Sequence, residues 1–405
     1  MDRDRVLSTS FEGLKDSMGD AKDLPAQIVA LLSDDPTERR DAIDAVQGRL
    51  FHQGTVAPAA ERAVPILIDI ALDRETVDRH LTLVFLRTLL TCLPENQRDA
   101  LGSGPSAKPT EIATRTAALI TARAGDFLSL LEADDARARG AAATLAAFAA
   151  MEPPQASLAT DRIAAARAVE AHPLAQASEA AAHSLAARRA SRPARDAFVA
   201  TLASGERLVR IAAAVGVLGS IDGERSFVDA ADVLRDAEPG ELLLEYHDFP
   251  WASGDPGLLA AEALSFAARK CRSDKPVPEW TPFEVAAVRA MKRIIAARLP
   301  FRDAEARRIT PGQVMLARMQ GLPEPAVYEP PADELQKAYS LTQLGTYLLE
   351  IAFSDLQGRE QPATREDLRP EQLELVRFLA VECALAAHYG RFGLPPSYED
   401  LAAFF

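Results

Sequence analysis

The chain has 405 residues, of which 48% are hydrophobic and only 6% are aromatic. This hydrophobic fraction excludes an intrinsically disordered chain, and the low aromatic content favours helices that pack closely through small side chains. Lysine and arginine number 45 against 59 aspartate and glutamate, and the resulting net charge of −14 disfavours a polyanionic partner and favours a basic protein.

The cysteines and the amino terminus indicate a cytoplasmic protein. Cys92, Cys271 and Cys383 lie far apart and form no CxxC pair, so neither a disulfide framework nor a zinc knuckle is indicated. The opening residues, MDRDRVLSTSF, carry charge where a signal peptide needs an apolar run. Since no stretch of about 18 uninterrupted apolar residues occurs, we expect no membrane partner.

The predicted elements begin after a polar lead-in, residues 1–23. A short helix is expected from Leu24, and the next begins near Pro36, which suits a first helical turn. Further helices are predicted over 58–72 and 75–93.

The hairpin predicted over 126–150 shows how the chain is organised. An apolar face at 127–131 is followed by an acidic turn and by a second face at spacing i, i+4, i+7 from Ala141. Because its side chains are small, one such hairpin buries too little surface alone and needs similar neighbours on both sides.

A repeat becomes visible when the second helices are aligned. An acidic residue precedes an arginine by four positions in four places: Asp35 and Arg39, Glu75 and Arg79, Asp135 and Arg139, Glu206 and Arg210. Ser178 takes the same place in a helix that lacks the arginine, so the steps are 40, 60, 39 and 32 residues. A period of about 40 is typical of two-helix repeats. We interpret the charged pairs as structural positions that cap helices and bridge turns, each contributing a few tenths of a kcal/mol.

These segments resemble a known family. DDPTERRDAIDAV, DDARARGAAATLAAF and GERLVRIAAAVGVLG resemble the second helices of HEAT repeats, and AVPILIDIAL resembles a first helix with its proline. The run RLFHQGTVAPAAERAVPILIDIAL is similar to the opening of bacterial HEAT-repeat (armadillo-like) proteins of unassigned role. The resemblance covers roughly residues 24–270, and it implies an α-solenoid with a binding role and no reaction.

Two insertions and a change of pattern set the expected domain boundaries. Polar insertions are predicted at 94–110 and 222–256 within a repeat array that spans 24–279. Residues 222–262 carry eleven acidic side chains against Arg225 and Arg235. Beyond Trp280 the repeat character is lost, and residues 280–405 are expected to form a helical C-terminal module.

No motif for chemistry appears. GxSxG, GxxxxGK[ST] and HExxH are all missing from the sequence, and the six histidines are scattered without metal-ligand spacing. We therefore predict no catalytic residue, no metal site and no cofactor.

The sharpest local feature lies within the acidic insertion: Glu245, Tyr246, His247, Asp248, Phe249 and Trp251. Aromatic side chains among carboxylates suit a partner that presents lysine or arginine. The alternative is that the aromatic rings turn inward and hold a long loop against the array.

Two basic stretches favour a different function. Arg188, Arg189, Arg192 and Arg195 lie within eight residues, and residues 285–310 carry seven basic against two acidic side chains. They would serve nucleic-acid binding in the manner of alkylpurine DNA glycosylases built on HEAT-like repeats. The simpler interpretation is that they pair with acidic neighbours or cover apolar helix faces.

The sequence thus predicts an all-α fold: a right-handed α-solenoid of HEAT-like hairpins with a helical C-terminal module. The predicted function is a non-enzymatic protein-binding scaffold or adaptor, one version of which is an immunity-type inhibitor of a basic partner. The alternative is a HEAT-like DNA glycosylase, or another enzyme of HEAT-like build that acts on nucleic acid or a prosthetic group. An enzyme would use Glu245, His247, Asp248 and Trp251, the local candidates for a pocket.

Overall fold

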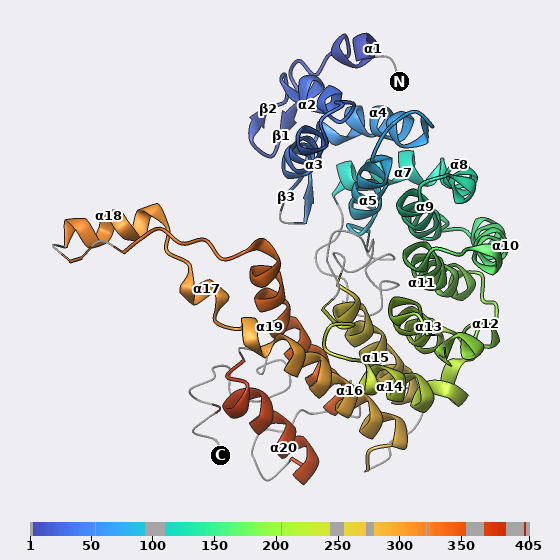
Figure 1. Cartoon of the computed structure of the whole chain (residues 1–405). Coiled ribbons are helices and arrows are strands. Elements are labelled where there is room, and N and C mark those ends of the chain that lie inside the picture. The colour runs from blue at the N-terminus through green and yellow to red at the C-terminus, as the bar shows by residue number, and fades with distance from the viewer. Residues whose placement is uncertain are drawn as a thin grey trace. The chain divides into compact units, whose positions relative to one another are not determined.

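The computed structural model is predominantly helical, which confirms the predicted all-α class (Figure 1). It describes residues 3–52, 54–93, 110–203, 205–243, 255–272, 279–320, 322–323, 325–353, 368–385 and 401. The chain divides into two compact units: unit 1 is Met1–Ser226 with Asp248–Ser253, and unit 2 is Phe227–His247 with Gly254–Phe405.

Unit 1 begins with short elements that the sequence pattern does not reveal. Between α1 (Arg3–Leu7) and α2 (Leu24–Ala30), the expected polar lead-in contains an antiparallel hairpin of β1 (Lys15–Asp16) and β2 (Gly19–Asp20). The Asp16 carboxylate accepts from Arg49 Nε at 2.5 Å. This ion pair ties the hairpin to the end of α3 (Pro36–Leu50), which is followed by a second hairpin, β3 (Phe51–His52) and β4 (Thr55–Val56).

The rest of unit 1 is a succession of helices: α4 (Ala60–Leu72), α5 (Arg79–Leu90), α7 (Glu111–Thr121), α8 (Ala124–Phe127), η1 (Leu128–Glu132), α9 (Ala136–Ala149), α10 (Pro153–Val169), α11 (Pro173–Arg189), α12 (Asp196–Val199), η2 (Ala200–Ala203), α13 (Arg207–Gly219) and η3 (Gly223–Ser226). Helix α5 packs against α9, α9 against α11, and α11 against α13. Each of these four helices also packs against an element that precedes it in the chain: α5 on α4, α9 on η1, α11 on α10, and α13 on η2. Successive helical pairs therefore lie side by side (Figure 1).

Small residues set the distance between these neighbouring helices. A Cβ atom on Gly140 of α9 would lie 2.9 Å from Ser178 Cβ of α11, and one on Gly216 of α13 would lie 2.7 Å from the Phe198 ring. Both approaches are shorter than real Cβ contacts. Close packing of this kind is what the alanine-rich, aromatic-poor composition predicts.

Helix α5 differs from its predicted span of 75–93, because it begins four residues later, at Arg79. The Asp73 carboxylate accepts from the Glu75 backbone N–H at 3.1 Å, and the Thr76 N–H bonds to the Asp73 carbonyl. These bonds hold Glu75 in a turn. The helix starts only after Asp78, whose φ of 53° is left-handed and therefore non-helical.

Unit 2 is helical too: α14 (Phe227–Asp236), α15 (Pro256–Arg272), α16 (Pro282–Arg298), η5 (Leu299–Phe301), α17 (Ala304–Arg307), α18 (Pro311–Met319), α19 (Ala332–Ala352), α20 (Pro370–Arg377) and a π-helical turn, η8 (Phe378–Glu382). The unit therefore begins about fifty residues before the expected boundary at 280. The physical reason is packing, since α14 packs on α16 and α15 packs on α19. Phe227 meets Phe283 at 5.2 Å between ring centroids, and the buried Glu350 accepts from Ser265 and Arg269.

A buried ion pair fixes the start of α15 in unit 2. Arg298 donates to the Asp255 carboxylate and, at 3.1 Å, to the Leu242 carbonyl. Both members of the pair are buried, so the charges are shielded from water. Gly257 leaves room for the guanidinium, because a Cβ atom there would lie 2.6 Å from Arg298 Nη2.

Candidate functional site

The predicted partner-binding segment contributes no described residue to the candidate site. Its residues lie outside the described part of the chain: Glu245, Tyr246, His247, Asp248, Phe249 and Trp251. The expected insertion at 94–110 lies outside it as well, apart from Thr110, the N-cap of α7. The candidate site is therefore built from the described residues of unit 1.

Two of the repeat arginines, Arg39 and Arg139, make the same set of contacts. Arg139 donates to the carbonyls of Ala133 and Asp134, at 2.7 and 3.0 Å, and so holds the turn before its own helix. It also forms a two-pronged pair with Glu170, at 2.6 and 2.8 Å. Each arginine of this type can thus join its own turn to a carboxylate of the following helical pair.

Arg39 makes the same contacts two repeat positions earlier, before Arg79. Its guanidinium donates to the carbonyls of Ser33 and Asp34, at 2.8 and 3.0 Å, and to the Asp78 carboxylate. Although burial opposes ionisation of Asp78, its bond to Arg39 holds the pKa of that carboxyl below its ordinary value. The pair is therefore charged at neutral pH.

The other repeat positions make more local contacts. Asp35 and Asp135 are N-caps that accept from the backbone N–H two residues on, at 2.8 and 3.0 Å. Arg79 reaches the Asp73 carbonyl at 3.4 Å. Glu206 is the N-cap residue of α13 but makes no side-chain cap bond, and its carbonyl accepts from the Arg210 backbone N–H. Glu75 is not a cap, since it sits in the turn before α5.

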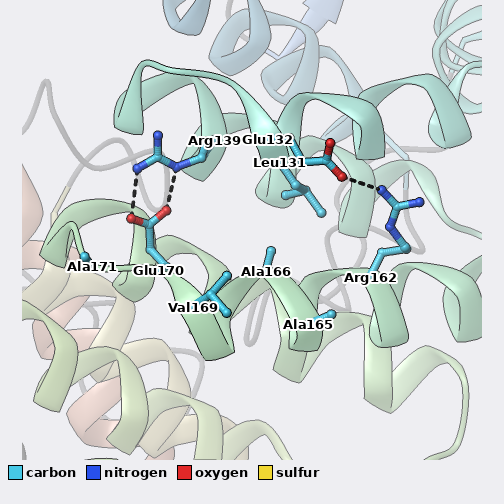
Figure 2. Close-up of a pocket in the computed structure, with 9 residues that line it drawn as sticks. All are labelled: Leu131, Glu132, Arg139, Arg162, Ala165, Ala166, Val169, Glu170 and Ala171. Atoms are coloured by element: carbon cyan, nitrogen blue, oxygen red, sulfur yellow. Dashed lines mark hydrogen bonds and ion pairs between the residues drawn. The ribbon is translucent and has the colours of Figure 1, made fainter.

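A groove opens between η1, the start of α9 and α10. Its volume is about 500 Å³, and it is lined by Leu131, Glu132, Arg139, Arg162, Ala165, Ala166, Val169, Glu170 and Ala171. Figure 2 shows the Arg139–Glu170 pair at one end, the Arg162–Glu132 pair at the other, and apolar side chains between them. The groove thus has an apolar floor between two charged ends.

The two ends of the groove differ in strength. The hydrogen bond to Glu170 raises the pKa of Arg139, and the pKa of Glu170 is lowered by Arg139 even though burial opposes it. This end is rigid and internally neutral. At the other end Arg162 and Glu132 meet at only 3.4 Å, and both side chains are largely exposed. An exposed pair of this kind contributes at most about 1 kcal/mol, so its members can pair with a ligand instead.

Val169 exposes an apolar side chain to water at the edge of the groove floor. It is 84% exposed, the largest exposed fraction among the large hydrophobic residues of the described chain. It is also the last residue of α10, directly before Glu170. Together with Leu131 and the alanines of the floor, Val169 gives the groove apolar surface that another molecule could cover.

A buried polar cluster on α10 and α11 interacts with the rigid end of the groove. Glu179 has no exposed surface, and neither of its carboxyl oxygens has a hydrogen-bond partner among the described residues. Burial raises the pKa of Glu179 to about 8; the charge of Glu170 adds to this effect, whereas Arg139 and Arg167 oppose it. Glu179 is therefore mostly uncharged at pH 7, which suits its position.

His183 lies one turn after Glu179 on α11 and is also uncharged. Burial lowers its pKa to about 4, with Arg167 and Arg192 adding to the effect, and its Nδ1 has no hydrogen-bond partner in the described chain. Arg167 lies 4.8 Å above the Phe198 ring and donates to Thr201 at 2.9 Å. The cluster holds three ionisable side chains, of which burial suppresses the charge of two at neutral pH.

The basic stretch 188–195, which begins at the end of α11, is already engaged within unit 1. Arg189 donates to the carbonyls of Ala147 and Phe148, at 2.7 and 2.8 Å, and Arg188 to that of Gly219. Arg192 pairs with Asp161 at 2.7 Å, and Arg195 pairs with Asp196 and donates to Ser226. Each of the four arginines thus has a partner within the protein, although the Arg192 side chain stays 42% exposed.

The acidic stretch 222–262 contributes to the fold where it is described. Asp222 accepts from the backbone N–H groups of Ala194 and Arg195, at 3.1 Å each. Asp255 pairs with Arg298, and Glu262 accepts from the Tyr347 hydroxyl at 2.9 Å. Several of its carboxylates are thus structural.

Sequence patterns did not indicate the groove. Glu170 lies 31 residues from Arg139, and no local spacing joins them. A signal for Glu179 exists, since it is the one carboxylate in the run QASEAAAHSLAA. Full burial of an acid is unusual, but a segment rich in alanine and without other charges is typical of a buried helix.

Comparison of this chain with family models, curated proteins and solved structures gave no match. Within the described residues, no three His, Cys, Asp or Glu side chains gather as metal ligands. Among the helices described, none has the length and hydrophobicity needed to cross a bilayer.

Proposed function

We propose that the chain is a non-enzymatic protein-binding scaffold or adaptor, and that the groove between η1, α9 and α10 is its binding site. The observation that carries the proposal is the apolar floor between two charged ends, with Val169 84% exposed at its edge. A peptide fits this arrangement, because an apolar side chain would cover Val169 while polar groups pair at the ends.

The architecture proposed for unit 1 is an α-solenoid of HEAT-like hairpins. The succession of α5, α9, α11 and α13, each packed on the next, supports it. So does the equivalence of Arg39 and Arg139, which contact their own turn and a later carboxylate in the same way. Stacks of this kind present long surfaces suited to protein partners.

The partner is proposed to be basic, and an inhibitor of a basic protein is one form of this role. The net charge of −14 favours such a partner at long range. At short range, the Glu132 side chain is 82% exposed beside the groove. Nucleic acid is a poorer fit, because the arginines of the stretch 188–195 bind carbonyls and carboxylates of unit 1.

The experiment compares four tagged forms of the full chain in lysate of the native host. These are the unchanged chain, Val169→Glu, the matched control Val77→Glu, and a form with Tyr246, Phe249 and Trp251 changed to Ala. Val77 is 61% exposed and does not line the groove, so it controls for the added charge. Each captured protein is then purified and titrated against the same four forms by calorimetry.

We expect a basic protein that binds the unchanged chain and Val77→Glu, and binds Val169→Glu at least about tenfold more weakly, as for loss of a central contact. Loss of binding only in the triple alanine form would place the site in residues 222–262 and overturn the groove proposal. Failure of all four forms to bind any protein would overturn the scaffold role.

A further inference from the structure

Helix α18 of unit 2 keeps all of its described side chains at least partly exposed. Helix α18 has nine residues, begins with a capping box between Thr310 and Gln313, and is followed by a chain that returns to Tyr328. Tyr328 and Ile309 exchange backbone hydrogen bonds of 2.8 and 3.0 Å, which close the excursion at its base. Salt bridges from Arg307 to Glu334 and from Arg308 to Glu329 reinforce this base. We call residues 309–328 the α18 arm.

The arm exposes a concentration of large apolar side chains. None of the described side chains of α18 is buried, and Figure 1 shows the helix at the outer end of the arm, away from α19. Six of the sixteen exposed large hydrophobic residues of the described chain lie here, with exposed fractions of 41–74%: Met315, Leu316, Met319, Leu322, Val327 and Tyr328. Met315, Leu316 and Met319 share one side of the helix, because they are spaced i, i+1 and i+4.

A helix of this length needs a partner surface to be stable. Isolated helices shorter than about 12 residues are marginal in water, and most helical stability in proteins comes from packing one apolar face. The capping box contributes only about 1 kcal/mol. The exposed apolar side of α18 therefore gains stability when it docks on another surface.

We propose that the α18 arm is a dimerisation element, and that its six exposed apolar side chains pack against the same arm of a second copy of this chain. Each of the six side chains exposes about 100 Å², which gives up to about 600 Å² per chain and about 1,200 Å² for a symmetric pair, the lower end of specific interfaces. A symmetric pair uses the same patch twice, the arrangement found in most homodimers.

Charge also favours a second copy as the occupant. The chain carries a net charge of −14, so two copies repel each other over most of their surface. Residues 311–328 contain one arginine, Arg318, and one glutamate, Glu324, and are therefore neutral overall. Two arms that meet therefore bring no net charge of one sign together. Methionine adds flexible side chains that adapt to one another across such a contact.

The test is sedimentation velocity of the full chain from about 1 to 100 μM, with two matched variants. Met319→Glu places a charge in the proposed interface, whereas Met18→Glu places it on the β1–β2 turn of unit 1. The two methionines are 74% and 73% exposed, so the variants differ only in location.

We expect a monomer–dimer equilibrium that Met18→Glu leaves unchanged and Met319→Glu weakens at least about tenfold. Added salt should leave the equilibrium unchanged or strengthen it, because the contact is apolar and the overall repulsion is screened. A chain that stays monomeric, or a dimer equally sensitive or insensitive to both variants, would overturn the proposal. The scaffold role would stand in either case, since it rests on the groove of unit 1.

Discussion

Replacing Glu179 with Gln is expected to stabilise unit 1 increasingly as the pH rises. In the folded chain the pKa of Glu179 is about 8, against an ordinary value of 4.5. Between these values the unfolded chain is ionised at this position while the folded chain keeps its proton. The unfolded state then binds fewer protons, so the free energy of unfolding falls as the pH rises through this window. Gln cannot ionise and removes the effect.

The size of the effect follows from the slope of about 1.4 kcal/mol per pH unit for one proton. From pH 6.5 to 8.0 the gap between Glu179→Gln and the unchanged chain should widen by about 1.6 kcal/mol, because the slope falls to half as the pH reaches the folded pKa. His183 acts in the opposite direction. Its pKa is about 4 in the folded chain and 6.5 ordinarily, so the folded chain loses stability as the pH falls below 6.5. Measurements at pH 6.5 and above therefore report Glu179 with little contribution from His183.

The assay is urea unfolding at pH 6.5, 7.0, 7.5 and 8.0, followed by pulsed hydrogen exchange with mass spectrometry of α11 peptides, which reports unit 1 separately. Glu132→Gln is the matched control, because it makes the same change on an exposed side chain. Its gap should stay flat with pH. A flat gap for Glu179→Gln as well, with destabilisation at every pH, would mean that Glu179 is ionised in the folded chain, and the reasoning would be refuted.

Three further predictions concern packing and ion pairs. Gly216→Ala should lower the free energy of unfolding of unit 1 by about 1–3 kcal/mol, because its Cβ would overlap the Phe198 ring. Gly48→Ala in α3, where the space is open, should raise the free energy of unfolding by about 0.5–1 kcal/mol. Equal effects of the two substitutions in thermal unfolding would contradict this explanation. Arg298→Met should destabilise unit 2 by about 3–5 kcal/mol, since Asp255 would stay buried without its partner. An unchanged urea midpoint for the loss of hydrogen-exchange protection in α15 would argue against a buried pair. Arg162→Ala should change the stability of unit 1 by less than about 1 kcal/mol, as expected for an exposed pair, and a larger loss would show that this end of the groove is rigid.

Local sequence patterns were sufficient for the helical class and for several helix starts. Asp35 and Asp135 follow the preference of aspartate for N-caps, a short-range effect that depends on two or three residues. The four-residue spacing that singled out Arg39 and Arg139 is also local. What these arginines bind is not, because Asp78 and Glu170 lie 39 and 31 residues further on.

The misplaced features have identifiable physical causes. Helix α5 starts late because Asp73 holds the Glu75 N–H in a turn, a competition that helix periodicity does not detect. The short β1–β2 hairpin depends on the contact of Asp16 with Arg49, which is distant in sequence. The boundary between the two units was expected too late because α14 and α15 carry apolar faces like those of the repeats, yet pack on α16 and α19.

The groove depends on the same long-range contacts. Its apolar floor joins Leu131 of η1 to Val169 of α10, and its rigid end joins Arg139 to Glu170. Each residue is unremarkable within its own segment. Only the packing of α9, α10 and α11 makes a site of them.

Site-specific photo-cross-linking tests most directly whether this groove binds a protein. A benzophenone amino acid replaces Ala165, an exposed groove residue, or Val77 as the control, and cells of the native host that produce these forms are irradiated. Our account predicts a cross-linked protein from position 165, none from position 77, and loss of the product when Val169→Glu is added. Equal products from both positions, or no protein product from position 165, would contradict it.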